Sequence, residues 1–129
     1  MIGQTISHYR VLAPLGSGGM GVVYEAEDVR LGRKVSIKLL SEEVCANPEH
    51  VQRFLREARV ISSLNHPHIC TLHDIGETGC QQYMVMELME GEPLKARIAR
   101  GPLPMGEVLE LGAQMADAHH KLEALEKAQ

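Results

Sequence analysis

Three glycines and a lysine have the spacing of a phosphate-binding loop. Gly16, Gly18 and Gly21 precede Lys38, which ends the segment Val35-Ser36-Ile37-Lys38. Glycine lets backbone N–H groups approach a phosphate without interference from a Cβ atom, and Gly19 loosens the loop further. The lysine adds a positive charge for the same anion. These residue types indicate the binding of a phosphorylated ligand.

The residues beside the glycines distinguish two kinds of nucleotide-binding loop. In a dinucleotide-binding fold, a helix follows the glycines directly. Here they run into Val22-Val23-Tyr24-Glu25-Ala26, which is rich in β-branched and aromatic residues, and the strand-like run 8–12 precedes them. This favours strand, glycine turn, strand, with the turn lying over its ligand. The alternative is an ordinary glycine-rich hairpin.

The lysine must be aimed by the strand that carries it. Side chains alternate between the two faces of a strand. Ser36 and Lys38 therefore share one face, while Val35, Ile37 and Leu39 share the other. We expect the face with the lysine to look into the ligand cleft.

A helix is predicted from Asn47 to about Leu64, because Asn47 suits the N-cap and Pro48 the first helical position. Its buried stripe holds Val51, Phe54, Leu55, Ala58, Ile61 and Leu64 at helical spacing. Glu57 lies at the edge of that stripe, where a carboxylate needs a cation. Lys38 is the predicted partner, and the alternative is a surface pair with Arg53.

The segment 66–73 contains three histidines and Cys70, which raises the question of a zinc site. The spacings do not form the ligand pairs of structural zinc sites, and the apolar residues between them fit the start of a strand. No metal is expected here. Strands are predicted at 71–76 and 82–88, so the chain has five strands with one helix inserted after the third.

These segments together resemble a protein kinase domain of the bacterial serine/threonine type. The resemblance rests on Gly16-x-Gly18-x-x-Gly21-x-Val23, on Val35-Ser36-Ile37-Lys38, where the family has alanine at 36, on Arg56-Glu57-Ala58, on the His-Pro-x-Ile turn at 66–69, and on the hinge-like run ending in Met89-Glu90-Gly91. It covers the whole N-lobe, roughly residues 9 to 91, and only the first two helices of the C-lobe. It implies an α+β fold: an antiparallel five-stranded N-lobe over 1–92, followed by two helices of an incomplete C-lobe over 93–129.

The resemblance also assigns roles in ATP binding. The loop glycines with Ser17 cover the phosphates, Lys38 grips them, and Glu57 orients the lysine. Adenine lies against the hinge: Met86 is the gatekeeper, the Glu87 carbonyl accepts from the adenine amino group, and the Met89 N–H donates to the ring. Leu15 and Val23 cover the ring, and Ser36 lies beneath it.

Residues 93–129 contain none of the later kinase motifs. A short helix is predicted at 93–100 and a long one from Met105 to about Lys127. No His-Arg-Asp, Asp-Phe-Gly or Ala-Pro-Glu occurs in the 129 residues, so no catalytic base or magnesium ligand can be assigned. We expect this chain alone to be inactive, with protein substrates belonging to the complete kinase.

The long helix suggests a second reading, that of a non-catalytic module. Its apolar residues alternate three and four apart, which predicts a stripe able to pair with a second copy. Self-association into a homodimer is therefore expected, and the alternative is a frayed tail. The stripe consists of Val108, Leu111, Met115, Ala118, Leu122 and Leu125.

Composition limits the remaining possibilities. The net charge of −4 gives no reason to propose nucleic acid as a partner, and no apolar run is long enough for a membrane span. Three cysteines without a signal peptide indicate reduced thiols and a cytoplasmic location.

Overall fold

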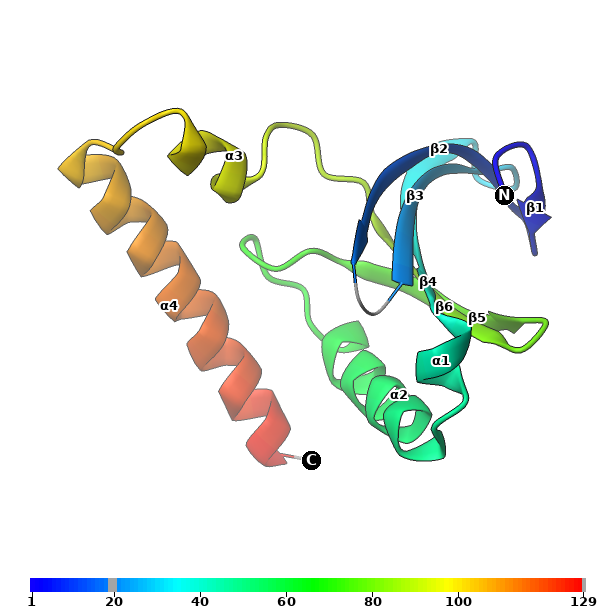
Figure 1. Cartoon of the computed structure of the whole chain (residues 1–129). Helices are drawn as coiled ribbons and strands as arrows, with labels where there is room; N and C mark the ends of the chain where they lie inside the picture. The colour runs from blue at the N-terminus through cyan, green and yellow to red at the C-terminus, as the bar shows by residue number, and fades with distance from the viewer. Residues whose placement is uncertain (19–20, 129) are drawn as a thin grey trace.

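The computed structural model describes residues 1–18 and 21–128, so Gly19 of the predicted loop lies outside the described residues. Figure 1 shows a curled sheet, with the helical part of the chain beside it. The elements are β1 (Thr5–Ile6), β2 (Tyr9–Gly18), β3 (Gly21–Asp28), β4 (Arg33–Leu40), α1 (Glu42–Cys45), α2 (Pro48–Ser62), β5 (Leu72–Thr78), β6 (Gln81–Glu87), α3 (Leu94–Ala99) and α4 (Met105–Ala128).

The predicted antiparallel sheet is confirmed, but its strand count was too low. Within residues 1–18 and 21–128 the sheet has six strands in the order β1-β2-β3-β4-β6-β5, and each neighbouring pair is antiparallel. The added strand, β1, consists of two residues, and Ile6 pairs with Tyr9. Two residues are too short to show the alternation that identifies a strand, which is why the sequence did not predict it.

Helix α2 begins as its sequence predicts. The Asn47 side chain accepts from the Glu49 N–H at 3.0 Å, and Pro48 takes the first turn. Helix α1 was not predicted. It is a single turn capped by Ser41, whose side chain accepts from the Val44 N–H at 3.3 Å. Both helices follow β4, so the chain turns away from the sheet between its third and fourth long strands (Figure 1).

The core lies on one face of β4 and its neighbours. Val35 and Ile37 have no exposed surface and Leu39 is buried, whereas Ser36 and Lys38 are half-buried. The predicted alternation of this strand is therefore confirmed. The same cluster includes Ile6, Tyr9, Val11, Ala26, Tyr83 and Val85. Burial of these side chains fixes the core-facing side of β4. The opposite face of the strand, which carries Ser36 and Lys38, remains available to a ligand.

Helix α4 runs beside α2 and touches it (Figure 1). One polar contact joins the turn after α2 to α4: His66 Nε2 lies 3.1 Å from Asp117 Oδ2. Of the predicted apolar stripe, Val108 and Met115 are 44% and 54% exposed, while the other members are half-buried. Pairing with a second copy stays a prediction. No helix of the described residues, 1–18 and 21–128, is both long and apolar enough for a bilayer crossing.

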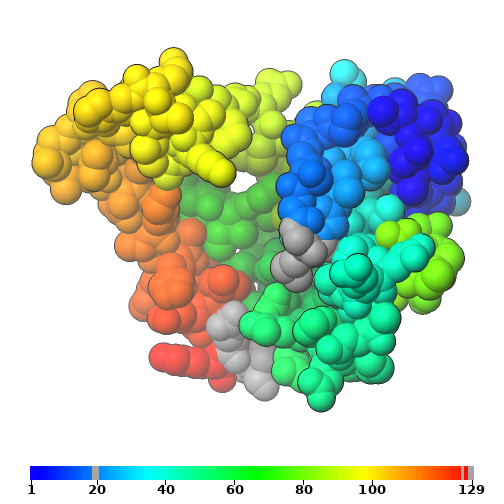
Figure 2. All heavy atoms as spheres, in the orientation of Figure 1, coloured from blue at the N-terminus to red at the C-terminus, as the bar shows by residue number. Residues whose placement is uncertain are grey.

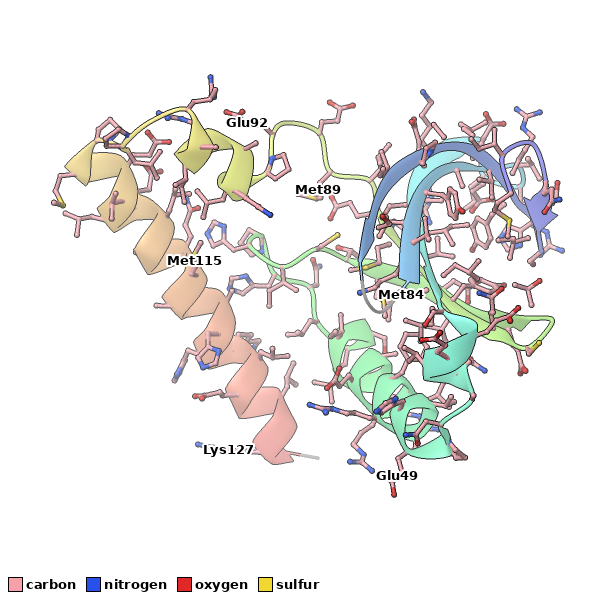
Figure 3. The ribbon with its side chains drawn as sticks, in the orientation of Figure 1. Glu49, Met84, Met89, Glu92, Met115 and Lys127 are labelled. Carbon is pink, nitrogen blue, oxygen red and sulfur yellow. The ribbon has the colours of Figure 1, made fainter. Side chains whose placement is uncertain are left out.

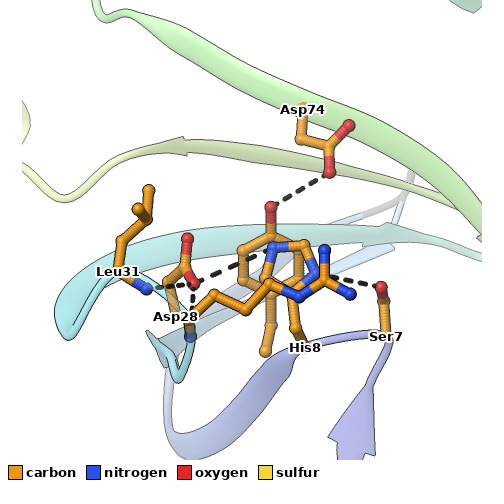
Figure 4. Close-up of polar contacts among 7 residues, drawn as sticks. Ser7, His8, Asp28, Leu31 and Asp74 are labelled. Atoms are coloured by element: carbon orange, nitrogen blue, oxygen red, sulfur yellow. Dashed lines mark hydrogen bonds and ion pairs between the residues drawn. The ribbon is translucent and has the colours of Figure 1, made fainter.

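A buried carboxylate closes the turn between β3 and β4. Asp28 is 2% exposed, and its Oδ1 accepts from the N–H groups of Arg30 at 3.0 Å and Leu31 at 3.1 Å (Figure 4). His8 Nε2 lies 3.8 Å from the same oxygen. Burial by itself would raise the pKa of Asp28, but these N–H donors and the nearby His8 and Arg33 charges outweigh it and lower the pKa below its usual value.

This lowered pKa predicts a loss of stability in acid. Because the folded pKa of Asp28 lies below the unfolded one, its stabilisation is present above about pH 4 and is lost as the pH falls through the folded pKa. Asp28→Asn keeps the Oδ1 acceptor and has no charge to lose. Its free energy of unfolding, measured by urea titration at several pH values, should fall less in acid than that of wild type.

The exposed Glu90 provides the matched control, since Glu90→Gln should follow the wild-type pH dependence. Equal acid losses in wild type and Asp28→Asn would contradict a stabilising role for the Asp28 charge.

Candidate nucleotide-binding site

The glycine turn joins β2 to β3 above the end of β4. Gly16 pairs with Val23, Ser17 with Val22, and Gly18 with Gly21, so the predicted hairpin is confirmed on both sides of the turn. A Cβ atom added at Gly16 or Gly18 would meet nothing within 4 Å. At these two positions, the side of the backbone on which a Cβ atom would lie is therefore not covered by the described residues.

Leu15 occupies a bulge in the same hairpin. The register runs from Pro14 opposite Tyr24 to Gly16 opposite Val23, so Leu15 has no partner in the ladder, and its side chain is 51% exposed. Bulges often re-aim a side chain next to a binding site. This placement is compatible with the predicted role of Leu15 as a cover for the base.

The strand register brings the predicted residues of three strands into rows. Paired residues of an antiparallel sheet point to the same face. Lys38 lies opposite Val23 on β3 and opposite Met84 on β6. In the next row Ser36 lies opposite Met86. The face that carries Lys38 thus also carries Val23, the predicted cover of the base, and Met86, the predicted gatekeeper.

Met84 belongs to this face too, because it lies opposite Lys38. It is half-buried, whereas its neighbours Tyr83 and Val85 are the buried residues of β6. Figure 3 shows Met84 on the sheet beneath the β2–β3 hairpin, and Met89 on the segment that leaves the sheet toward α3. Met89 is 65% exposed.

Glu57 pairs with Arg53, which was the alternative partner to Lys38 in the sequence analysis. Its Oε1 accepts from Arg53 Nε at 3.3 Å, and the two side chains are 60% and 77% exposed. Lys38 forms no ion pair with any residue that the structure describes. The predicted Lys38–Glu57 pair is therefore absent from this structure. An exposed pair at this spacing is worth about 0.3–0.5 kcal/mol, so Glu57 is held only weakly by Arg53.

The backbone carbonyl of Glu87 receives two side-chain donors. The Ser36 Oγ lies 3.5 Å from this oxygen, and the Cys70 Sγ lies 3.3 Å from it. Burial, and then the negative charge of Glu87, raise the pKa of the Cys70 thiol, so the thiol remains protonated and can donate. The side-chain carboxylate of Glu87 has a separate partner, since its Oε1 accepts from the Thr71 N–H at 3.3 Å.

Cys70 was missed as a neighbour of the site. Its contact arises because β6 lies between β4 and β5, which brings the segment before β5 to the end of β6. The Glu87 N–H also donates to the Thr71 carbonyl at 2.8 Å. The pairing of β5 with β6 as a hairpin could have been predicted from the sequence. Its register would have placed Cys70 and Thr71, just before β5, beside Glu87 at the end of β6.

A hollow of about 500 Å³ lies behind the hinge segment, between the turn after α2 and helix α4. The space-filling view shows the molecule hollowed between the β2–β3 hairpin and the α3–α4 segment (Figure 2). The lining includes Glu87, Met89, Leu111 and Met115. Glu87 and Met89 therefore border this hollow.

The histidine-rich segment has internal partners. His66 Nδ1 accepts from the His68 N–H at 3.0 Å, while its Nε2 faces Asp117. Within residues 1–18 and 21–128, no group of three or more His, Cys, Asp or Glu side chains is arranged to hold a metal ion.

Comparison with known proteins agrees with this geometry. The profile of the protein kinase domain matches residues 9–124. The chain therefore belongs to the protein kinase family.

Its relatives are bacterial serine/threonine-protein kinases. The chain is 48% identical over 109 residues to pkn2 of Myxococcus xanthus, covering 84% of this chain and 13% of that protein. It is 44% identical to PrkC of Bacillus subtilis over 120 residues, covering 92% and 18%. The crystal structure of the Mycobacterium tuberculosis PknI kinase domain matches with a TM-score of 0.86 and 33% identity, covering 95% of this chain and 50% of that one. The chain thus spans about half of a solved kinase domain and less than a third of these curated relatives.

Proposed function

We propose that this chain is the ATP-binding lobe of a serine/threonine protein kinase. The observation that supports it most is the arrangement of residues on β3, β4 and β6. Lys38 lies between Val23 and Met84, one row from Ser36 and Met86, and β3 is also the second strand of the glycine hairpin. The lysine charge suits the phosphates of a nucleoside triphosphate, and the Glu87 carbonyl beside Ser36 can accept from its base.

Each end of ATP has its own set of residues in this proposal. Gly16, Ser17, Gly18 and Gly21 cover the phosphates with backbone N–H groups, Gly19 belongs to the same loop, and Lys38 binds the phosphates from below. Leu15, Val23, Ser36 and Met86 enclose the base, which contacts the Glu87 carbonyl and the Met89 N–H. In the complete kinase Glu57 would leave Arg53 and orient Lys38.

Phosphoryl transfer needs more than this lobe. Magnesium ions neutralise the developing charge, and a positioned base accepts the hydroxyl proton of the substrate. The 129 residues contain neither the catalytic-loop nor the metal-binding motif. We therefore propose that the chain by itself binds ATP weakly, that magnesium helps this binding little, and that transfer to protein serine or threonine belongs to the complete kinase domain.

Calorimetric titration of the 129-residue chain with ATP, with and without magnesium, tests the proposal. Lys38→Met removes a charge-assisted contact worth about 1.5–3 kcal/mol, so ATP affinity should fall by about 10–100-fold. Lys34→Met is the matched control, because Lys34 lies on the same strand and pairs with Glu25 at 3.3 Å. Its ATP affinity should equal that of wild type.

Two results would reject the proposal. Wild type that shows no saturable binding at millimolar ATP has no working nucleotide cleft. Binding that survives Lys38→Met unchanged means that ATP lies elsewhere.

A further inference from the structure

Ser36 sits at the point where the base would be recognised. Its Oγ lies 3.5 Å from the Glu87 carbonyl oxygen, on the same strand face as Lys38. The carbonyl is the proposed acceptor for the 6-amino group of adenine. A hydroxyl beside that acceptor is a polar group that the family's usual alanine would not provide.

The Glu87 carbonyl already has two side-chain donors near it. A carbonyl oxygen carries two lone pairs. The Cys70 thiol lies 3.3 Å from this oxygen, on the side of β5, and the Ser36 hydroxyl lies 3.5 Å from it, on β4. An incoming adenine amino group would therefore compete with these donors for the oxygen, and the Ser36 hydroxyl is the competitor on the face that carries Lys38.

A purine with oxygen at position 6 would interact differently with the Glu87 carbonyl and the Ser36 hydroxyl. A carbonyl can only accept, so it repels a 6-oxo group, whereas a hydroxyl can donate to one. The Ser36 hydroxyl can rotate from Glu87 to the purine O6, and the Glu87 carbonyl then keeps the Cys70 thiol as its donor. Ser36 thus makes adenine binding less favourable and 6-oxopurine binding more favourable.

We propose that Ser36 determines the base specificity of this site by narrowing its preference for 6-aminopurine over 6-oxopurine nucleoside triphosphates. This inference rests on the proposed ATP-binding function. A net neutral hydrogen bond corresponds to about a 2–10-fold change in affinity, which sets the size of the effect. The ligands of the site are therefore expected to include inosine triphosphate beside ATP.

The test compares ATP with inosine triphosphate by calorimetry on the 129-residue chain. The two ligands share the ribose and phosphates and differ at position 6 and in the proton on N1, and the N1 difference acts equally in every variant. The measured quantity is the ratio of the dissociation constant for inosine triphosphate to that for ATP. Ser36→Ala should raise this ratio by about 2–10-fold, and Ser36→Thr, which keeps the hydroxyl, should retain the wild-type ratio.

Two further variants complete the design. Ser36→Cys replaces the hydroxyl with a weaker donor of similar shape, so it should raise the ratio in the same direction. Ser62→Ala removes an exposed hydroxyl that donates to the Arg59 carbonyl on α2, and it should leave the ratio unchanged.

The outcomes separate this inference from the function on which it rests. Saturable ATP binding with equal ratios in wild type and Ser36→Ala would overturn the specificity role and leave the nucleotide site in place. Failure of both nucleotides to bind wild type would overturn both proposals.

Discussion

Replacing Ile37 by alanine is expected to lower the free energy of unfolding by about 2–5 kcal/mol. Ile37 has no exposed surface and lies in the middle of β4, opposite Tyr24 on β3 and Val85 on β6. Truncation leaves a cavity where three strands meet. Small domains have only about 5–15 kcal/mol of total stability, so this loss is a large fraction of it.

Urea denaturation followed by circular dichroism measures the effect. Ile98→Ala is the matched control, because Ile98 is 55% exposed on α3, and its change should stay within about 0.5 kcal/mol. A change as small as this in Ile37→Ala would mean that β4 does not carry the core.

Gly21→Ala is the second change with a large expected effect, a loss of about 2–4 kcal/mol of stability. Gly21 has φ +153°, a backbone conformation that other residues rarely adopt. A Cβ atom there would also overlap the backbone carbonyl of Leu39 on β4. The backbone cannot yield cheaply at this point, because Gly21 and Leu39 both belong to paired strands of the sheet.

The matched control for this change is Gly16→Ala in the same hairpin. Gly16 has no positive φ, and an added Cβ atom would meet nothing within 4 Å. Its midpoint of thermal unfolding should stay close to that of wild type, while that of Gly21→Ala should fall by several degrees. Equal midpoints would show that the turn relaxes freely.

The two substitutions with the largest expected effects act on β4 in different ways. Ile37 holds β4 from the core face, and Gly21 allows β3 to cross close to Leu39 at the end of the same strand. Lys38 lies between Ile37 and Leu39 on this strand. The position of the lysine therefore depends on core packing and on a close backbone approach between β3 and β4.

Local patterns predicted much of the fold. The alternation along β4 gave the correct buried face, and Asn47 with Pro48 gave the correct start of α2. These features depend on residues close together in the chain, so their physical causes can be recognised without neighbours from elsewhere. The single-turn helix α1 and the two-residue strand β1 were missed because each is too short to show a period.

Contacts between distant segments were harder to predict. Glu57 could meet Lys38 or Arg53, and the choice depends on how α2 is placed against β4. The strand order β4-β6-β5 brings Cys70 to the carbonyl of Glu87, although 17 residues separate them. Periodicity describes which face of an element is buried, but it does not describe which element covers that face.

The sequence by itself determined the family, the glycine hairpin, and the facing of Lys38 and Ser36, because these depend on motif spacing and on the two-residue period of a strand. Only the tertiary structure decided that Glu57 pairs with Arg53 and that Ser36 and Cys70 share the Glu87 carbonyl. Those contacts depend on the packing of α2 and on the order of strands in the sheet, which bring together groups that are far apart in the chain.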